Sequence, residues 1–391
     1  MLNIDFKEHN REVKAMWEAF YRGEAYRMPM ILGVNPRYLL LNRELNPKNI
    51  TYREYTGDPE IMLQIQLEFS HYMAMNVLSD REMGLPEKGW NLSIDFQNCG
   101  EAAWLGCPVR YIDGNVPSVD AFLREDNKNE LFERGIPDPF SGLMAKVKEY
   151  YETMTPKLPG MSYMGAPVKS FSPSQTLWCD GPFTVACDLR GTTELCMDIY
   201  ADPEYARELL SFVTDALIAK IKAWRKYLGE PEKSEGLWFA DDSVALLSTE
   251  MHEEIVLPCH QKLTRELSRE GYTHSIHLCG DATRHFKTLV EKLNVACFDT
   301  GFPVRHGALV AELGPDITVQ GGPHIEFLRT KTPEEIMAET KRIIDEVKPL
   351  TRRFILREGN NVAPGTPAEN LNAMYEACRK FGNYTENANE N

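Results

Sequence analysis

The chain has 391 residues, of which 43 are Lys or Arg and 58 are Asp or Glu, so its net charge is −15. A strongly acidic chain repels phosphate backbones and anionic lipid surfaces, so neither nucleic acid nor a membrane is expected as a partner. No stretch approaches the roughly 18 apolar residues of a membrane span, and the N-terminus lacks an apolar signal core, so we expect a cytoplasmic protein.

Helical and strand patterns alternate along the second half of the chain. The first half gives one clear helix, at 143–151, inside a segment rich in Pro and Gly. Later helices are predicted at 202–227, 249–270, 282–293, 306–313, 332–347 and 366–381. The predicted strands are 236–240, 273–278, 295–298, 317–320 and 354–356. This alternation indicates an α/β protein with a parallel sheet, and the lack of a phosphate-binding glycine loop favours a (βα)8 TIM barrel over an open nucleotide-binding sheet.

Polar residues collect just after each of these strands. They are Asp241 and Asp242, then His277 and Cys279, then Asp299, then His324, and last Glu358, Asn360 and Asn361. In a barrel, the loops that follow the strands meet at one face, where active sites lie. We therefore expect these side chains to share one pocket.

His277 and Cys279 are the sharpest local feature. They lie two residues apart on a predicted strand, so both side chains point to the same face. Imidazole and thiolate are preferred zinc donors, and a third donor would come from a neighbouring strand end: Asp241, Asp242, His324 or Glu358. The alternative is a pair of half-buried barrel residues that bind no metal.

Several of the other polar residues have a simpler structural explanation. Asp241 and Asp242 suit the start of a helix, and because neighbours on a strand point to opposite faces, at most one is expected in the pocket. Capping or loop fixing also explains Asp299. His252 and His260 are expected on a solvated helix face.

The turn Gly321-Gly322-Pro323-His324 would either admit a planar ligand or simply close a tight loop. Trp238, Phe239 and Phe298 are expected in the core, although a pocket for a flat ring would use the same residue types. The nine cysteines include no CxxC pair, which indicates reduced and mostly buried thiols.

Several motifs resemble the uroporphyrinogen decarboxylase superfamily. They are Asp180-Gly-Pro-Phe-Thr, Leu189-Arg-Gly-Thr-Thr-Glu-Leu, Phe239-Ala-Asp-Asp, His277-Leu-Cys-Gly, and the run from Phe354 that closes with Thr-Pro-Ala-Glu-Asn-Leu. The similarity spans about residues 90 to 382, and within the superfamily the chain resembles the corrinoid-dependent methyltransferases. The resemblance implies a (βα)8 barrel at 91–382, an N-terminal helical and loop extension at 1–90 packed on it, and a frayed tail at 383–391.

The chain departs from the decarboxylases at two places. Their N-terminal arginine pair, which holds substrate carboxylates, is reduced here to Arg37, and their last-strand histidine falls at Asn360. A substrate with many carboxylates would therefore meet few cations. The resemblance to the decarboxylases proper is the weaker one.

The chain also departs from the thiol-methylating members, which hold zinc with His-x-Cys and a last-strand Gly-Cys. Here that position reads Gly359-Asn360, so either Glu358 or Asp241 supplies the third donor or zinc is absent. Tetrahydrofolate needs no metal, and the amides of Asn360 and Asn361 suit a pterin. The resemblance thus favours tetrahydrofolate or a methylated substrate over a thiol.

Together these observations predict an enzyme that moves a methyl group between cobalamin on a partner corrinoid protein and a small molecule. The predicted catalytic residues are Asp241, Asp242 and His277; the substrate-binding residues are Asn360, Asn361, His324 and Asp299; and the metal ligands are His277, Cys279 and Glu358. The alternative is a decarboxylase-like lyase for a small carboxylic acid, with Arg190, Arg305 and Arg357 as cations. A barrel that only binds a corrinoid protein is disfavoured, because such a surface has no need of converging His, Cys and Asp.

Overall fold

The computed structural model describes residue 2 and residues 4–384, so most of the predicted frayed tail, from residue 385 onward, lies outside the described part. Within that part, no helix has the length and apolar character needed to cross a membrane. The cysteines of the chain are all unpaired thiols, as expected, and those buried are Cys99, Cys107, Cys179, Cys187 and Cys378.

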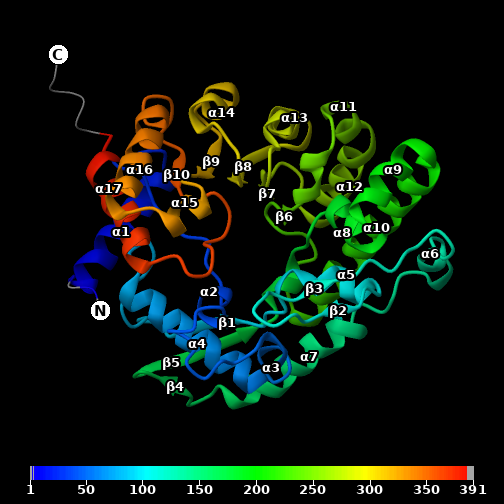
Figure 1. Cartoon of the computed structure of the whole chain (residues 1–391), viewed down its shortest axis with the longest axis horizontal. Helices are drawn as coiled ribbons and strands as arrows, with labels where there is room; N and C mark the ends of the chain where they lie inside the picture. Colours follow the sequence, from blue (N-terminus) through cyan, green and yellow to red (C-terminus); the bar gives the residue numbers. More distant parts are fainter. Residues whose placement is uncertain (1, 3, 385–391) are drawn as a thin grey trace.

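Helices account for most of the regular structure, and they are drawn in Figure 1. In the first half they are α1 (Phe6–Tyr21), α2 (Arg37–Leu40), α3 (Tyr52–Tyr55), α4 (Pro59–Asn76), α5 (Gly100–Leu105), α6 (Glu130–Arg134), α7 (Gly142–Met154), α8 (Pro182–Arg190) and α9 (Thr192–Ala201). In the second half they are α10 (Pro203–Leu228), α11 (Thr249–Met251), α12 (Leu257–Leu267), α13 (Thr283–Leu293), α14 (His306–Leu313), α15 (Ile325–Thr330), α16 (Pro333–Val347) and α17 (Ala368–Phe381).

Five parallel strands form the main sheet, in the order β10-β9-β8-β7-β6. They are β6 (Trp238–Ala240), β7 (His274–Leu278), β8 (Val295–Thr300), β9 (Thr318–Gly321) and β10 (Phe354–Leu356). The remaining strands are β1 (Trp90–Ser93), β2 (Val109–Arg110), β3 (Ser118–Val119), β4 (Ser162–Tyr163) and β5 (Ala166–Ser172), of which β1 and β5 pair in parallel.

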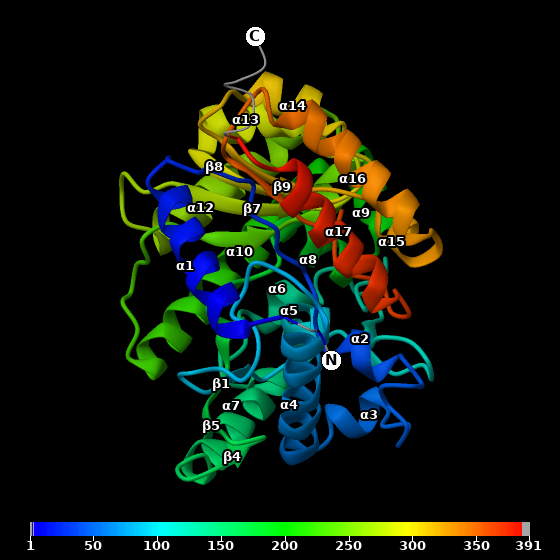
Figure 2. The same cartoon turned by 90° about the vertical axis from the view of Figure 1, so that its left-hand side faces the viewer.

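Isolated parallel bridges extend the main sheet at both edges. Asp180 pairs with Ala240 beyond β6, and Met30 pairs with Leu356 beyond β10. Helices cover the outer side of the strands in Figure 1, and Figure 2 shows α4, α7, β4 and β5 gathered at one end of the molecule. The architecture is the predicted TIM-barrel-type α/β fold, with its wall completed by short extended segments rather than by regular strands alone.

Local sequence signals explain the boundaries of the helices that separate the strands. Asp202 caps α10 by accepting the N–H of Tyr205, and Gly229 ends it in the left-handed conformation with φ +74°. Thr332 and Glu335 form a capping box at the start of α16. Every helix and strand predicted in the second half is present, with ends shifted by at most three residues.

The N-terminal segment contributes directly to the sheet. The N–H of Ile31 donates to the carbonyl of Leu356 at 3.0 Å, and the N–H of Leu356 donates to Pro29 at 2.8 Å. The buried Arg27 also ties this segment to Asp80 at 2.8 Å. The division of the chain at residue 90 stays a prediction, and these contacts show that the first ninety residues hold one edge of the wall.

Candidate active site

Three donor atoms converge at the carboxyl ends of β6 and β7. His277 Nε2 lies 2.9 Å from Cys279 Sγ and 3.5 Å from Asp242 Oδ1, and that same carboxylate oxygen accepts the N–H of Cys279 at 2.8 Å. These ligand atoms all lie within 4.8 Å of one another, and no other group of three such donors is found among the described residues. The side chain of Asp242 is 39% exposed, so the cluster is open on that side.

The strand register explains why these residues meet. His277 pairs with Ala240 on β6 and with Asp299 on β8, so the last residues of the three strands lie side by side. The end of β8 packs tightly on the cluster at Gly301, where an added Cβ would lie 2.6 Å from the Cα of Cys279. Only glycine allows this approach of two backbones.

Asp299 orients the imidazole of His277 from behind. Its Oδ2 lies 2.9 Å from His277 Nδ1, and the same oxygen accepts a hydrogen bond from the guanidinium of Arg357. Sequence reasoning expected Asp299 to follow its strand and to cap, fix a loop or bind substrate; instead it lies inside β8 and faces His277. A carboxylate on the far nitrogen of a histidine is the usual support of a metal ligand, because it fixes the tautomer and the ring orientation.

The electrostatics of the cluster favour a positive charge between its acids. Burial by itself would lower the pKa of His277, but Asp299, Cys279 and Asp242 outweigh it and raise that pKa to about 11. Burial raises the pKa of the Cys279 thiol, and the neighbouring His277 counteracts part of that rise. A divalent cation bound by the three donors would supply the positive charge that these groups attract.

The donor set fits zinc. Zinc accepts imidazole nitrogen, thiolate and carboxylate together, and a site with three protein ligands leaves a position for substrate. A thiolate ligand disfavours magnesium and calcium, which prefer oxygen. The residues that would hold the ion are His277, Cys279 and Asp242, supported by Asp299.

An Asp299→Asn variant tests this support. The amide keeps the shape but loses the charge that holds the imidazole, so we expect zinc affinity to fall by roughly 10- to 100-fold. Competition with a chromophoric chelator measures the affinity, and Asp316→Asn at an exposed position of the same barrel serves as the control. Equal affinities in all three proteins would remove Asp299 from the site.

Asp241 does not enter the cluster, although it was predicted as a catalytic residue. Its carboxylate is fully buried and accepts the N–H and the hydroxyl of Thr184, each at 2.7 Å. Its other oxygen lies 2.7 Å from His260 Nε2, and its N–H donates to the carbonyl of His277 at 3.2 Å. Asp241 therefore fixes the backbone beside the cluster, while Asp242 points into it, as the expectation of a single inward aspartate requires.

The expectation of a solvated face for His252 and His260 is wrong. Both are fully buried, and so is His285, whose ring lies 4.6 Å from that of His252. The predicted helix contains a π-helical turn over His252–Val256, which shifts the phase of its buried face. Burial and the two neighbouring histidines lower the pKa of His252 to about 2, so it stays neutral.

Glu358, predicted as a metal ligand, lies apart from the donor cluster. Its Oε1 accepts the N–H of Gly33 at 2.8 Å and lies 3.4 Å from Arg357 Nε. Burial raises its pKa to about 7 despite the nearby Arg357. The structure brings Asp242, rather than Glu358, to His277 and Cys279.

Glu358 makes stability depend on pH. Its folded-state pKa lies above the model value of 4.5, so its contribution is present below about pH 4.5 and is lost as pH rises through about 7. Between pH 5 and pH 8 we expect the free energy of unfolding to fall by roughly 2–3 kcal/mol through this group, and a Glu358→Gln variant to lack that fall. Urea unfolding at both pH values measures it, with Glu369→Gln at an exposed position as the control. Identical pH slopes for wild type and Glu358→Gln would contradict the assignment.

The remaining predicted binding residues lie on the loops that follow β9 and β10. His324 caps α15, accepting the N–H of Glu326 at 3.1 Å, and its backbone bridges to Gly359. Asn360 adopts φ +120°, which is strained for a residue with a side chain and marks a constrained turn. Asn361 follows it, and the role of these three side chains in binding substrate stays a prediction.

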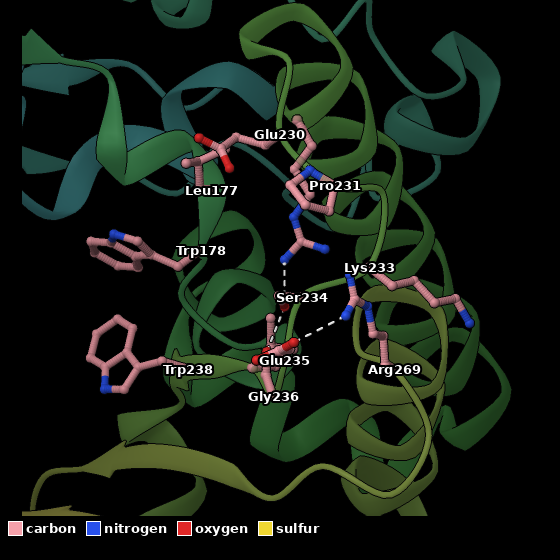
Figure 3. A pocket seen from close by; sticks show the side chains of 12 residues that line it. Leu177, Trp178, Glu230, Pro231, Lys233, Ser234, Glu235, Gly236, Trp238 and Arg269 are labelled. Atoms are coloured by element: carbon pink, nitrogen blue, oxygen red, sulfur yellow. Dashed lines mark hydrogen bonds and ion pairs between the residues drawn. The ribbon is translucent and has the colours of Figure 1, made fainter.

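The largest described recess near the sheet lies at the opposite, amino-terminal end of β6. It encloses about 600 Å³ and is lined by the loop 230–237 together with Trp178, Trp238 and Arg225 (Figure 3). Trp238, expected in the core, is 38% exposed, because residues on its register face the barrel interior. Phe239 and Phe298 are fully buried, as expected.

Comparisons with known proteins agree with this geometry. The family profile described as uroporphyrinogen decarboxylase (URO-D) matches residues 91–381. A methylated-thiol–coenzyme M methyltransferase of Methanosarcina mazei is 27% identical over 290 residues, covering 72% of this chain and 70% of that protein. A uroporphyrinogen decarboxylase of Anaeromyxobacter dehalogenans is 24% identical, covering 86% of this chain and 89% of that protein. A solved methyltransferase from Methanosarcina mazei superposes with a TM-score of 0.65 at 17% identity, over 94% of this chain and 98% of the other, which shows a common fold.

Proposed function

The chain belongs to the uroporphyrinogen decarboxylase family, and from that premise we propose that it is a methyltransferase that works with a corrinoid protein. The observation that carries the proposal is the convergence of His277, Cys279 and Asp242 at the open end of the strands. A decarboxylase needs cations for its carboxylates, whereas methyl transfer needs a group that controls charge on the atom that gains or loses the methyl.

Zinc bound to these donors would act as a Lewis acid toward a heteroatom of the small substrate. Asp299 would hold His277 in the orientation that binds the ion, and Asp241 would hold the backbone of β6 and β7 in register. The half-exposed Asp242 leaves room for the substrate, and Asn360 and Asn361 would orient it. Positioning is the main task of such a site, because displacement at a methyl carbon must be in line.

The small substrate is proposed to be tetrahydrofolate or a methylated compound rather than a thiol. The cluster contains one sulfur donor, because Asn360 stands where thiol-methylating relatives carry cysteine. A carboxylate in place of a second thiolate makes the bound ion a stronger Lewis acid and a poorer match for a soft thiolate substrate. The cobalamin would be carried by the partner protein and presented at the carboxyl ends of the strands.

Decarboxylation of a small acid is the competing proposal, and the cations named for it are largely engaged. Arg190 is buried and bound to Asp198 at 2.7 Å, far along α8 from the strand ends. Arg357 is committed to Asp299. Release of carbon dioxide without any cobalamin would nevertheless decide for this alternative.

The experiment combines the purified protein with methylcobalamin and, in turn, tetrahydrofolate, coenzyme M and homocysteine. We expect the visible spectrum of methylcobalamin to change to that of the demethylated cofactor with tetrahydrofolate and least with the thiols. The reverse reaction starts from cob(I)alamin and a methylated donor. No change of the cobalamin spectrum in either direction would contradict the proposed function.

A further inference from the structure

Asp180 lies beside the donor cluster on the interior side of the wall. It pairs with Ala240, Ala240 pairs with His277, and His277 pairs with Asp299, all in parallel register. Residues paired in this way on neighbouring strands point to the same side of a sheet. Asp180 therefore faces the same interior space as His277, with only the methyl group of Ala240 between their strands.

No protein group satisfies the Asp180 carboxyl. Within residues 4–384, no hydrogen bond or ion pair reaches its side chain, although it lines an enclosed recess together with Gln97, Gln175 and Trp178. The neighbouring Glu101 is occupied by the buried Lys220, whose Nζ lies 2.5 Å from Glu101 Oε1 and 3.0 Å from the Trp178 carbonyl. A carboxyl group that is packed in the wall but unbound is available to a substrate.

The charged groups around Asp180 keep its proton on. Burial raises its pKa well above the usual range, and the acids that face it raise it further: Glu101 from α5, Asp188 from α8, and Asp241 and Asp242 at the end of β6. The one cation nearby, Lys220 from α10, is bound to Glu101. Asp180 is thus a neutral carboxylic acid next to a cluster of metal donors.

Two tryptophans provide an apolar floor below this layer. Trp178 precedes Asp180 by two residues, and Trp238 pairs with Ser275, one step below the pair of Ala240 and His277. Their rings meet edge to face at 4.8 Å, and Figure 3 shows both projecting to one side, away from the charged residues of the recess behind them. A ligand with an apolar body would rest here with a polar end between Asp180 and the donor cluster.

We propose that Asp180 is a catalytic acid that protonates the leaving oxygen of a methyl ether, which makes an apolar methyl ether the methyl donor of this enzyme. The inference rests on the proposed methyl transfer and goes beyond it. Asp180 gives its proton to the ether oxygen while the bond between methyl carbon and oxygen breaks, and the electrons of that bond stay on the oxygen. The reduced corrinoid supplies the electron pair for the new bond to the methyl group. The products are an alcohol or phenol and the Asp180 carboxylate, which regains its proton from water.

The chemistry requires such an acid only for some donors. An alkoxide or phenolate is a poor leaving group and gains from protonation, and a positioned acid contributes about 10²- to 10⁴-fold to such steps. A sulfonium donor leaves as a neutral thioether and needs no proton. A thiol acceptor has the opposite need, since it must lose a proton.

The test measures methylation of free cob(I)alamin by the full-length protein, with methoxybenzene and with trimethylsulfonium as donors. In an Asp180→Asn variant we expect the ether reaction to slow by about 10²- to 10⁴-fold and the sulfonium reaction to change less than about threefold. Asp188→Asn is the matched control, because Asp188 is a half-buried acid on α8 outside the paired layer. Infrared spectroscopy adds a readout that does not depend on turnover: a carboxylic acid band at neutral pH that disappears in Asp180→Asn.

The outcomes separate this proposal from the one on which it rests. Equal slowing of both donors would make Asp180 a structural residue, and transfer from sulfonium alone by wild type would exclude the ether; either result overturns the inference and leaves methyl transfer intact. Absence of the infrared band would overturn it as well. Failure of all cobalamin reactions, including demethylation of methylcobalamin, would reject the proposed function itself.

Discussion

Replacing His277 with alanine is expected to abolish metal binding and with it methyl transfer. The imidazole sits between the two other donors, 2.9 Å from Cys279 Sγ and 3.5 Å from Asp242 Oδ1, so its loss leaves two ligands on neighbouring strands. We expect zinc content to fall from about one ion per chain to a small fraction of that, and the rate to fall by at least about 10³-fold, because a Lewis acid supplies several kcal/mol. Elemental analysis of protein purified without chelator gives the zinc content.

Cys297→Ser is the matched control for this variant. Cys297 lies on β8, with its sulfur 3.3 Å from Gln320 Nε2, and it is not part of the donor cluster. It should retain zinc and activity. If His277→Ala kept the zinc content of wild type, the assignment of the metal to this cluster would be wrong.

Replacing Asp241 with alanine is expected to cause the largest loss of stability. The carboxylate is fully buried and accepts hydrogen bonds from the start of α8, from the Thr184 hydroxyl and from His260. Its removal leaves these buried donors unpaired, which costs about 3–5 kcal/mol of the free energy of unfolding. The midpoint of urea unfolding should therefore fall well below that of wild type.

Asp281→Ala provides the comparison, since Asp281 is exposed and its side chain makes no described contact in residues 4–384. It should change the free energy of unfolding by less than about 0.5 kcal/mol. Equal midpoints for Asp241→Ala and Asp281→Ala would show that the buried network contributes nothing to folding. Weakened zinc binding in Asp241→Ala alone is also expected, because its N–H holds the carbonyl of His277.

The strands and helices of the second half could be predicted because their signals are local. Hydrophobic periodicity, an Asp-Pro start and a Thr-Pro-Glu-Glu capping box lie within a few residues of the elements that they define. The placement of His277 and Cys279 on one face follows from the same local rule. The parallel order of the sheet then brings Asp242 and Asp299 to them.

Long-range contacts account for what the sequence did not predict. The π-helical turn at His252–Val256 and the partner of His260 depend on packing against Asp241, which no short pattern reveals. The choice of Asp242 over Glu358 depends on Gly33, an N-terminal residue that binds Glu358 across the wall. Asp180 was visible only as part of a motif, since its pairing with Ala240 is an isolated bridge.

X-ray absorption at the zinc edge of the purified protein is the most direct test of the central claim. With Cys279 as the only sulfur donor, the spectrum should fit one sulfur and otherwise nitrogen and oxygen ligands, and an Asp242→Ala variant should lose an oxygen ligand or the ion. A fit with two sulfur ligands, or a protein purified without zinc that also takes none up, would contradict the proposed centre.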